Sequence, residues 1–275
     1  MASVINKIEN LILLIFGVSL TLVSIYTAYF GTLDLMYQNT FHLTLISIIA
    51  LYKYPLKILE KKESLNFWIN TILSVLIIIG NVYIALYWEE LYISPFMTNI
   101  GVIIGAITIL ILLEITRRTV GFALVLITLV FIAYTFWGNL IHGFLSHRGY
   151  DLERLLVQVY VGTEGIYGIP LGTCATIVII FIIFGSFLDV AGAANVFLDL
   201  SMALMGKRRG GPAKIAVFSS GLMGMLSGSP AANVATTGTV TIPMMKQSGF
   251  PPYVAAAIEA TASSGGYKTP PIMVR

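Results

Sequence analysis

The sequence predicts an all-α polytopic membrane protein, in which six transmembrane helices precede a re-entrant, broken-helix hairpin. Two observations carry this prediction. Hydrophobic residues make up 57% of the 275 residues and charged residues 11%, whereas a typical soluble domain has about 45–50% and about 25%. Apolar stretches also recur at close to the roughly 20 residues that a helix needs to cross a bilayer. The expected surroundings are membrane lipid, and the net charge of +3 is too small to indicate a nucleic-acid partner.

The apolar stretches and the charges between them define a topology. Six spans are predicted, at residues 11–30, 35–52, 67–88, 91–113, 119–140 and 165–188, the second being the weakest. Basic residues follow the even-numbered spans: Lys53, Lys57, Lys61 and Lys62, then Arg117 and Arg118, then Lys207, Arg208, Arg209 and Lys214. Lysine and arginine collect on the cytoplasmic side, so we expect a cytoplasmic N-terminus. Near the end of the fourth span, Glu114 is read as a helix-end ion pair with the two arginines, or alternatively as part of a proton relay.

After the sixth span the pattern changes. Residues 190–206 predict a short or interfacial helix, and Lys214 and Lys246 then bracket a charge-free stretch that is rich in serine, threonine and glycine. Pro230 lacks an amide hydrogen and disfavours the helical conformation of the preceding residue, so the helix should break near residues 227–230. Pro243 is expected to interrupt the stretch again.

Carbonyls freed at such a break cannot face lipid. We expect them to line an enclosed cavity or to hold a ligand such as Na⁺, as unwound segments of secondary transporters do. The other reading is that serine, threonine and glycine serve tight helix packing, with the hydroxyls bonded back to their own helix. Glu259, in an otherwise small and apolar helix, is either a functional carboxylate or a brace for the broken helix.

These residues carry a resemblance to a known family. The motifs are Gly210-Gly211-Pro212-Ala213-Lys214, Ser227-Gly228-Ser229, Ala232-Asn233-Val234, Thr237-Gly238, Thr241-Ile242-Pro243 and Glu259-Ala260 with Ser263-Ser264-Gly265-Gly266. In this order they resemble the large membrane subunit of tripartite ATP-independent periplasmic (TRAP) transporters, specifically the fused permeases of the TAXI branch. Residues 119–275 are similar to the N-terminal portion of the large permease domain. Residues 1–118 resemble the four-span small subunit in position, span count and topology.

The resemblance implies the first half of an inverted-repeat, elevator-type transporter in a bacterial or archaeal cytoplasmic membrane. An extracytoplasmic solute-binding protein would deliver a small organic-acid-like solute, and a Na⁺ gradient would drive its uptake without any cofactor. By the same resemblance the substrate- and ion-binding residues are Ser227, Gly228, Ser229, Asn233, Thr236, Thr237, Gly238, Glu259, Ser263, Ser264 and Gly266. The Na⁺ candidates among them are Ser227, Ser229, Asn233 and Thr237.

Two departures from the family pattern bear on these expectations. Lys268 stands where the family has a neutral polar residue, and the sequence ends before a second inverted repeat, so we expect a truncated permease. A non-transporting scaffold or fragment is therefore an alternative function. An intramembrane serine hydrolase is a further alternative, which is disfavoured because no histidine follows His147 to act as a base.

Overall fold

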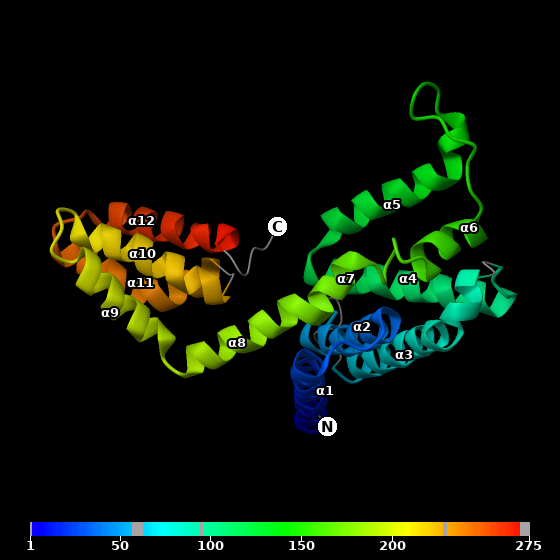
Figure 1. The fold of residues 1–275 in the computed structure, drawn as a ribbon, viewed down its shortest axis with the longest axis horizontal. Helices are drawn as coiled ribbons and strands as arrows, with labels where there is room; N and C mark the ends of the chain where they lie inside the picture. The colour runs from blue at the N-terminus through cyan, green and yellow to red at the C-terminus, as the bar shows by residue number, and fades with distance from the viewer. Residues whose placement is uncertain (1, 57–62, 94–95, 228–229, 270–275) are drawn as a thin grey trace. The chain divides into compact units, whose positions relative to one another are not determined.

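The computed structural model describes residues 2–56, 63–93, 96–227 and 230–269. The described chain contains helices and no strands, and it divides into two units, Met1–Thr176 and Ile177–Arg275 (Figure 1). Five helical stretches of the described chain are long and apolar enough to cross a membrane, as judged by length and composition. They are Ile5–Phe30, Ser64–Ile93, Asn99–Thr119, Phe122–Leu140 and Ile169–Leu188. The prediction of an all-α polytopic membrane protein is confirmed.

Unit 1 is built around four long helices. They are α1 (Ala2–Phe30), α2 (Leu35–Lys53), α3 (Glu63–Ile93) and α4 (Asn99–Thr119), and successive members pack side by side. The helix starts follow from local chemistry, because the Asp34 side chain accepts a hydrogen bond from the backbone amide of Met36 and the Thr98 side chain accepts one from Gly101. After α4, Gly121 adopts a positive φ of 112°, which favours glycine.

The rest of unit 1 is more irregular. Helix α5 (Phe122–Trp137) continues into the 3₁₀ turn η2 (Gly138–Leu140), and the short helix α6 (Leu152–Leu156) runs into the π-helical turn η3 (Val157–Val161). Helix α7 (Ile169–Thr173) then continues into the π-helical turn η4 (Cys174–Val178). The hydroxyl of Tyr160 donates to the Gly80 carbonyl at 2.5 Å, and that of Tyr167 donates to Asn81 Oδ1 at 2.6 Å. These buried bonds anchor residues 160–167 to α3.

The second predicted span differs from the other five. Residues 35–52 form a helix as expected, but α2 is not among the helices apolar enough to cross a membrane on composition alone. The reason is a set of polar residues that pack inside unit 1, namely Gln38, Asn39, Thr40, His42 and Ser47. Asn39 donates to the Tyr167 carbonyl at 2.7 Å and Gln38 to the Ala175 carbonyl at 3.2 Å. Five of the six predicted spans thus have the length and composition of a membrane span. Helix α2 buries its polar face against protein, and its place as the sixth span stays a prediction.

Unit 2 holds the region of the predicted break. Its helices are α8 (Ile179–Val190), α9 (Ala193–Met205), α10 (Gly211–Ser227), α11 (Pro230–Gln247) and α12 (Pro252–Ser264), which leads into the 3₁₀ turn η5 (Gly265–Lys268). The described part of α10 ends at Ser227, and α11 begins at Pro230. The predicted break falls on Gly228 and Ser229, which lie outside the described residues. The prediction that Pro243 interrupts the stretch is wrong, because α11 continues through this residue. The short helix expected at residues 190–206 is α9.

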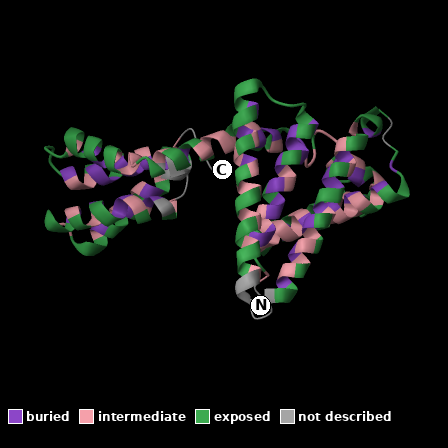
Figure 2. Cartoon of the chain, turned by 90° about the horizontal axis from the view of Figure 1, so that it is seen from below, coloured by how far each residue is buried: buried purple, intermediate pink, exposed green. Residues whose placement is uncertain are grey.

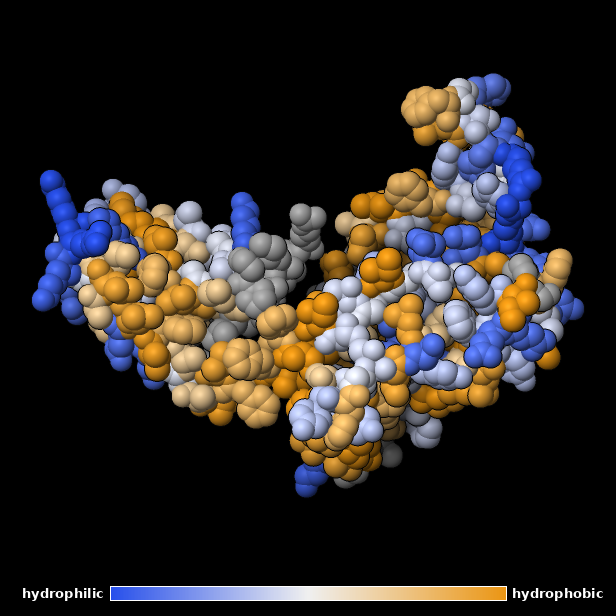
Figure 3. Space-filling view, in the orientation of Figure 1, coloured by the Kyte–Doolittle hydropathy of each residue, from blue (hydrophilic) through white to orange (hydrophobic). Residues whose placement is uncertain are grey.

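Helices α10, α11 and α12 pack against one another within unit 2. Their shared core holds Ala216, Met245 and Ala255, all fully buried. Buried residues lie on the helix faces that meet (Figure 2), while apolar side chains cover much of the exposed surface of each unit (Figure 3). With 17 and 18 residues, α10 and α11 are each about 26 Å long at ~1.5 Å per residue. The tip of the re-entrant hairpin expected here falls on residues 228–229, outside the part of the chain that the structure describes.

Candidate functional site

The candidate site lies among α10, α11 and α12, where the Glu259 carboxylate is fully buried. Hydroxyl groups from all three helices surround it. Ser220 of α10, Thr237 and Thr241 of α11, and Ser263 of α12 are also fully buried. We call these four residues with Glu259 the hydroxyl cluster. Its centre is polar, although the core next to it is made of small apolar residues.

The distances show how closely the hydroxyls approach the carboxylate. Thr237 Oγ1 lies 2.6 Å from Glu259 Oε1, and Thr241 Oγ1 lies 2.5 Å from Oε2. Ser220 Oγ and Ser263 Oγ each lie 3.1 Å from Oε1. The carboxylate therefore acts as a common acceptor that ties the three helices together.

Each hydroxyl has one proton, so its alternative acceptors matter. Thr237 can also donate to the Asn233 carbonyl at 2.9 Å, and Thr241 to the Thr237 carbonyl at 3.0 Å. In both cases the carboxylate oxygen is nearer. Ser220 has an alternative in Thr237 Oγ1 at 3.1 Å, whereas Ser263 has no second acceptor among the described residues. Ser263 is therefore the member that depends most on Glu259.

The helices can approach this closely because small residues line the contact. A Cβ atom placed on Gly238 would lie 3.2 Å from Glu259 Cγ and 3.4 Å from Ile242 Cδ1. Such contacts leave little space for a side chain at residue 238. The spacing of the polar residues places them together on the helix faces. Thr237 and Thr241 are four residues apart and so share one face of α11, and Glu259 and Ser263 likewise share one face of α12.

Asn233 extends the polar region toward the end of α11 that begins at Pro230. The side chain is fully buried, and its Nδ2 donates to the Ser220 carbonyl at 2.7 Å. Its Oδ1 has no hydrogen-bond partner among the described residues. An unpaired buried acceptor is costly, and it marks a place where a donor, a water molecule or a cation can bind.

The structure brings together five of the predicted site residues: Asn233, Thr237, Gly238, Glu259 and Ser263. Thr236 is half-buried outside the cluster, and its carbonyl accepts from Thr239. Ser264 is exposed and donates to the Ala260 carbonyl of its own helix. Gly228 and Ser229 lie outside the described residues, and neither the side chain of Ser227 nor the burial of Gly266 is described.

Two members of the cluster, Ser220 and Thr241, were not predicted as site residues. The four-residue spacing of Thr241 from Thr237 was the available signal. For Ser220 the sequence held none, because its neighbour Ser219 is also buried but bonds back to the Ile215 carbonyl of its own helix. For Glu259 the geometry supports the brace, since both carboxylate oxygens accept hydrogen bonds from surrounding hydroxyls.

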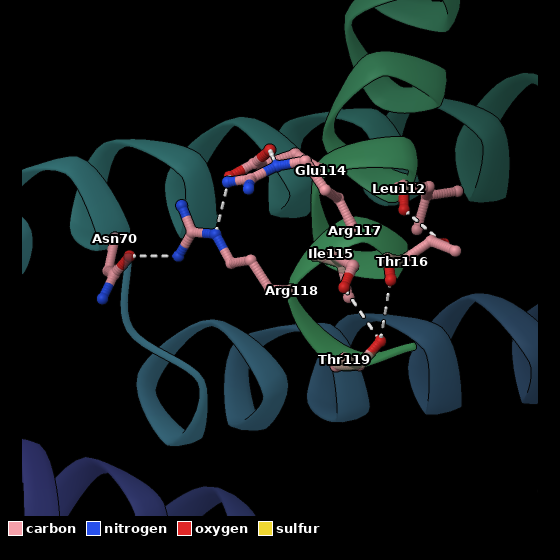
Figure 4. Close-up of polar contacts among 8 residues, drawn as sticks. All are labelled: Asn70, Leu112, Glu114, Ile115, Thr116, Arg117, Arg118 and Thr119. Atoms are coloured by element: carbon pink, nitrogen blue, oxygen red, sulfur yellow. Dashed lines mark hydrogen bonds and ion pairs between the residues drawn. The ribbon is translucent and has the colours of Figure 1, made fainter. Parts of the chain in front are cut away.

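A second polar cluster lies in unit 1 at the end of α4 (Figure 4). Glu114 accepts hydrogen bonds from Arg117 Nε at 2.8 Å and from Arg118 Nε at 2.8 Å. Arg118 also donates to Asn70 Oδ1 of α3 at 2.7 Å, and its side chain is only 3% exposed. The predicted helix-end ion pair is confirmed, and it also connects α4 to α3.

Comparison with known proteins decides the family. The family described as "Tripartite ATP-independent periplasmic transporter, DctM component" matches residues 107–275, more than half of the chain. The chain belongs to this family. Its curated relatives are named as large permease proteins of TRAP transporters. The assignment to the TAXI branch and the domain boundary at residues 118/119 stay predictions.

Curated DctM-family relatives are similar over about a third of this chain. The C4-dicarboxylate TRAP transporter large permease protein DctM of Pseudomonas aeruginosa is 37% identical over 94 residues, which are 34% of this chain and 22% of that protein. The isethionate TRAP transporter permease protein DctMQ of Oleidesulfovibrio alaskensis is 35% identical over 91 residues, which are 33% and 14%. The 2,3-diketo-L-gulonate TRAP transporter large permease protein YiaN of Escherichia coli is 33% identical over 90 residues, which are 33% and 20%. The chain thus spans about a fifth or less of the length of these relatives. No solved structure matches it.

Proposed function

We propose that this TRAP permease component couples the entry of Na⁺ to the uptake of a small organic-acid-like solute. An extracytoplasmic solute-binding protein delivers the solute to a bacterial or archaeal cytoplasmic membrane, in which the N-terminus faces the cytoplasm. The ion binds at the end of α11 nearest Pro230, where Asn233 and Thr237 lie together. Ser227 and Ser229, which flank the break predicted from the sequence, complete the proposed set of ion ligands.

The observation that carries this proposal is the unpartnered Oδ1 of Asn233 beside the buried hydroxyl cluster. Na⁺ is a hard cation, and such cations are bound by oxygen atoms from carbonyl, amide, hydroxyl and carboxylate groups. Asn233 supplies a free amide oxygen, and Thr237 places a hydroxyl one helical turn away. The Glu259 side chain adds a further oxygen close to these two, because its Oε1 lies 2.6 Å from the Thr237 hydroxyl.

The solute class rests on the relatives. Their names refer to C4-dicarboxylates, isethionate and 2,3-diketo-L-gulonate, which are all organic anions. The basic residues that follow the predicted even-numbered spans support the cytoplasmic N-terminus. A serine hydrolase gains no support, because the Ser220 hydroxyl contacts Thr237 and Glu259, and all three histidines of the sequence precede unit 2.

Ion binding can be tested on the purified chain in detergent. We expect its thermal unfolding midpoint to be higher in NaCl than in choline chloride of equal concentration, because a ligand that binds only the folded state stabilises it. Asn233→Ala and Thr237→Val should each abolish the difference. Thr239→Val is the matched control, since Thr239 is exposed on the same helix and bonds back to the Thr236 carbonyl.

The outcomes separate the alternatives. Equal midpoints in NaCl and choline chloride for the unmodified chain would refute the ion site and favour a scaffold without ion coupling. A Na⁺ effect that survives both substitutions would place the ion elsewhere. Coupling itself is then measured as solute uptake into proteoliposomes with the solute-binding protein, with and without an inward Na⁺ gradient.

A further inference from the structure

A cavity in unit 2, separate from the proposed ion site, is lined by both basic and apolar side chains. It has a volume of about 550 Å³ and lies between the end of α9, the first half of α10 and the middle of α12. Arg208 and Lys214 line one part of it, and Met205, Val217, Phe218 and Ile258 line the rest. The cavity is therefore basic at one end and apolar along its length.

The two basic side chains are available to a ligand. Arg208 and Lys214 are exposed, and neither forms an ion pair with any residue that the structure describes. No carboxylate occurs among the described residues that line the cavity. Hydrophilic side chains gather at the end of unit 2 that holds the connections from α9 to α10 and from α11 to α12 (Figure 3). An anion that approaches this end meets two positive charges without a competing acidic group.

The apolar wall follows directly from the helical period. Lys214, Val217 and Phe218 are three and four residues apart, so they share one face of α10. Val217 is 55% exposed and Phe218 36% exposed, which is more than a purely packed core would leave. Ile258 of α12 completes the wall on the opposite side of the cavity. The wall thus continues from the charged end toward the middle of the helices.

We propose that this cavity binds an anionic phospholipid, with the phosphate between Arg208 and Lys214 and an acyl chain along Val217, Phe218 and Ile258. A soluble anion would leave the exposed apolar wall unused, and a neutral lipid would leave both cations unpaired. Basic pockets at the cytoplasmic ends of membrane helices recognise anionic lipid headgroups in this way. The proposed topology places Arg208 and Lys214 on the cytoplasmic side, where such a lipid enters from the inner leaflet.

The binding test uses the purified full chain in a neutral detergent. Thermal unfolding is followed while dioleoyl phosphatidylglycerol or dioleoyl phosphatidylcholine is titrated in. We expect phosphatidylglycerol to raise the midpoint at concentrations at least tenfold lower than phosphatidylcholine. The double variant Arg208→Ala/Lys214→Ala should remove this preference. The matched control is Arg209→Ala/Lys246→Ala, which removes the same charge from the same end of unit 2 but outside the cavity lining.

Three results would overturn the proposal. One is equal stabilisation by the two lipids, and another is an equal loss in both double variants, which would indicate general charge attraction. The third is full protection by inorganic phosphate alone, which would indicate a site for a soluble anion.

A second measurement does not depend on removing charge. The variant Phe218→Trp places a fluorophore on the apolar wall, and brominated phosphatidylglycerol should quench it more strongly than brominated phosphatidylcholine. Quenching no greater than that of the native tryptophans in the unmodified chain would contradict the acyl-chain assignment.

Discussion

Removing the Glu259 side chain is the most direct test of the hydroxyl cluster. In Glu259→Ala the common acceptor of α10, α11 and α12 is lost, and four buried hydroxyls must find other partners. Ser220, Thr237 and Thr241 have second acceptors at 2.9–3.1 Å. Ser263 has none among the described residues, so its hydroxyl is left buried and unsatisfied.

The expected cost follows from these contacts. The unsatisfied buried hydroxyl of Ser263 costs about 1–3 kcal/mol. The vacated space adds about 2 kcal/mol. We expect Glu259→Ala to lower the free energy of unfolding by about 3–5 kcal/mol.

The assay is reversible unfolding of the purified chain in mixed micelles with increasing SDS. Ser219→Ala is the control, because Ser219 is equally buried on α10 but donates to the carbonyls of its own helix. We expect it to cost no more than about 1 kcal/mol. Glu259→Gln should fall between the two, since its amide can accept from Ser263 and donate to Thr241. A loss for Glu259→Ala no larger than for Ser219→Ala would refute the role of the carboxylate as a brace.

Two further predictions concern unit 1. Arg118→Ala should cost about 2–4 kcal/mol in the same assay, because it leaves Asn70 Oδ1 without its donor and removes one partner of Glu114. Arg117→Ala, at a side chain that is 38% exposed, should cost less than about 1 kcal/mol. Equal losses in the two variants would contradict the link between α3 and α4. Gly80→Ala should cost about 1–3 kcal/mol by overpacking, because its Cβ would collide with the side chain of Thr108 on α4. In the control variant Gly17→Ala the added Cβ has no neighbouring atom within 4 Å, so this change should be neutral or slightly stabilising. Similar stability changes in the two variants would exclude a close approach of α3 and α4 at Gly80.

Local features of the sequence predicted much of this architecture. Composition alone places the chain in a membrane, because its few charged residues cannot cover a soluble surface. The ion pair of Glu114 with Arg118 was also predictable, since it depends on residues within about one helical turn. The misplaced break at Pro243 shows the limit of such reasoning, because helix packing in unit 2 accommodates this proline inside α11.

Contacts between distant residues were decided only by the tertiary structure. Average hydropathy marks α2 as a weak span, but it does not tell that Asn39 bonds to Tyr167, 128 residues later in the sequence. Nor does the sequence distinguish Ser220 from Ser219, although only Ser220 reaches Glu259, 39 residues away. The sequence determined the class of protein, the positions of the helices and the segments in which side chains with oxygen atoms are concentrated. The rotation and packing of the helices decided which of those groups meet, because a hydrogen bond depends on distances of a few tenths of an ångström that no local pattern encodes.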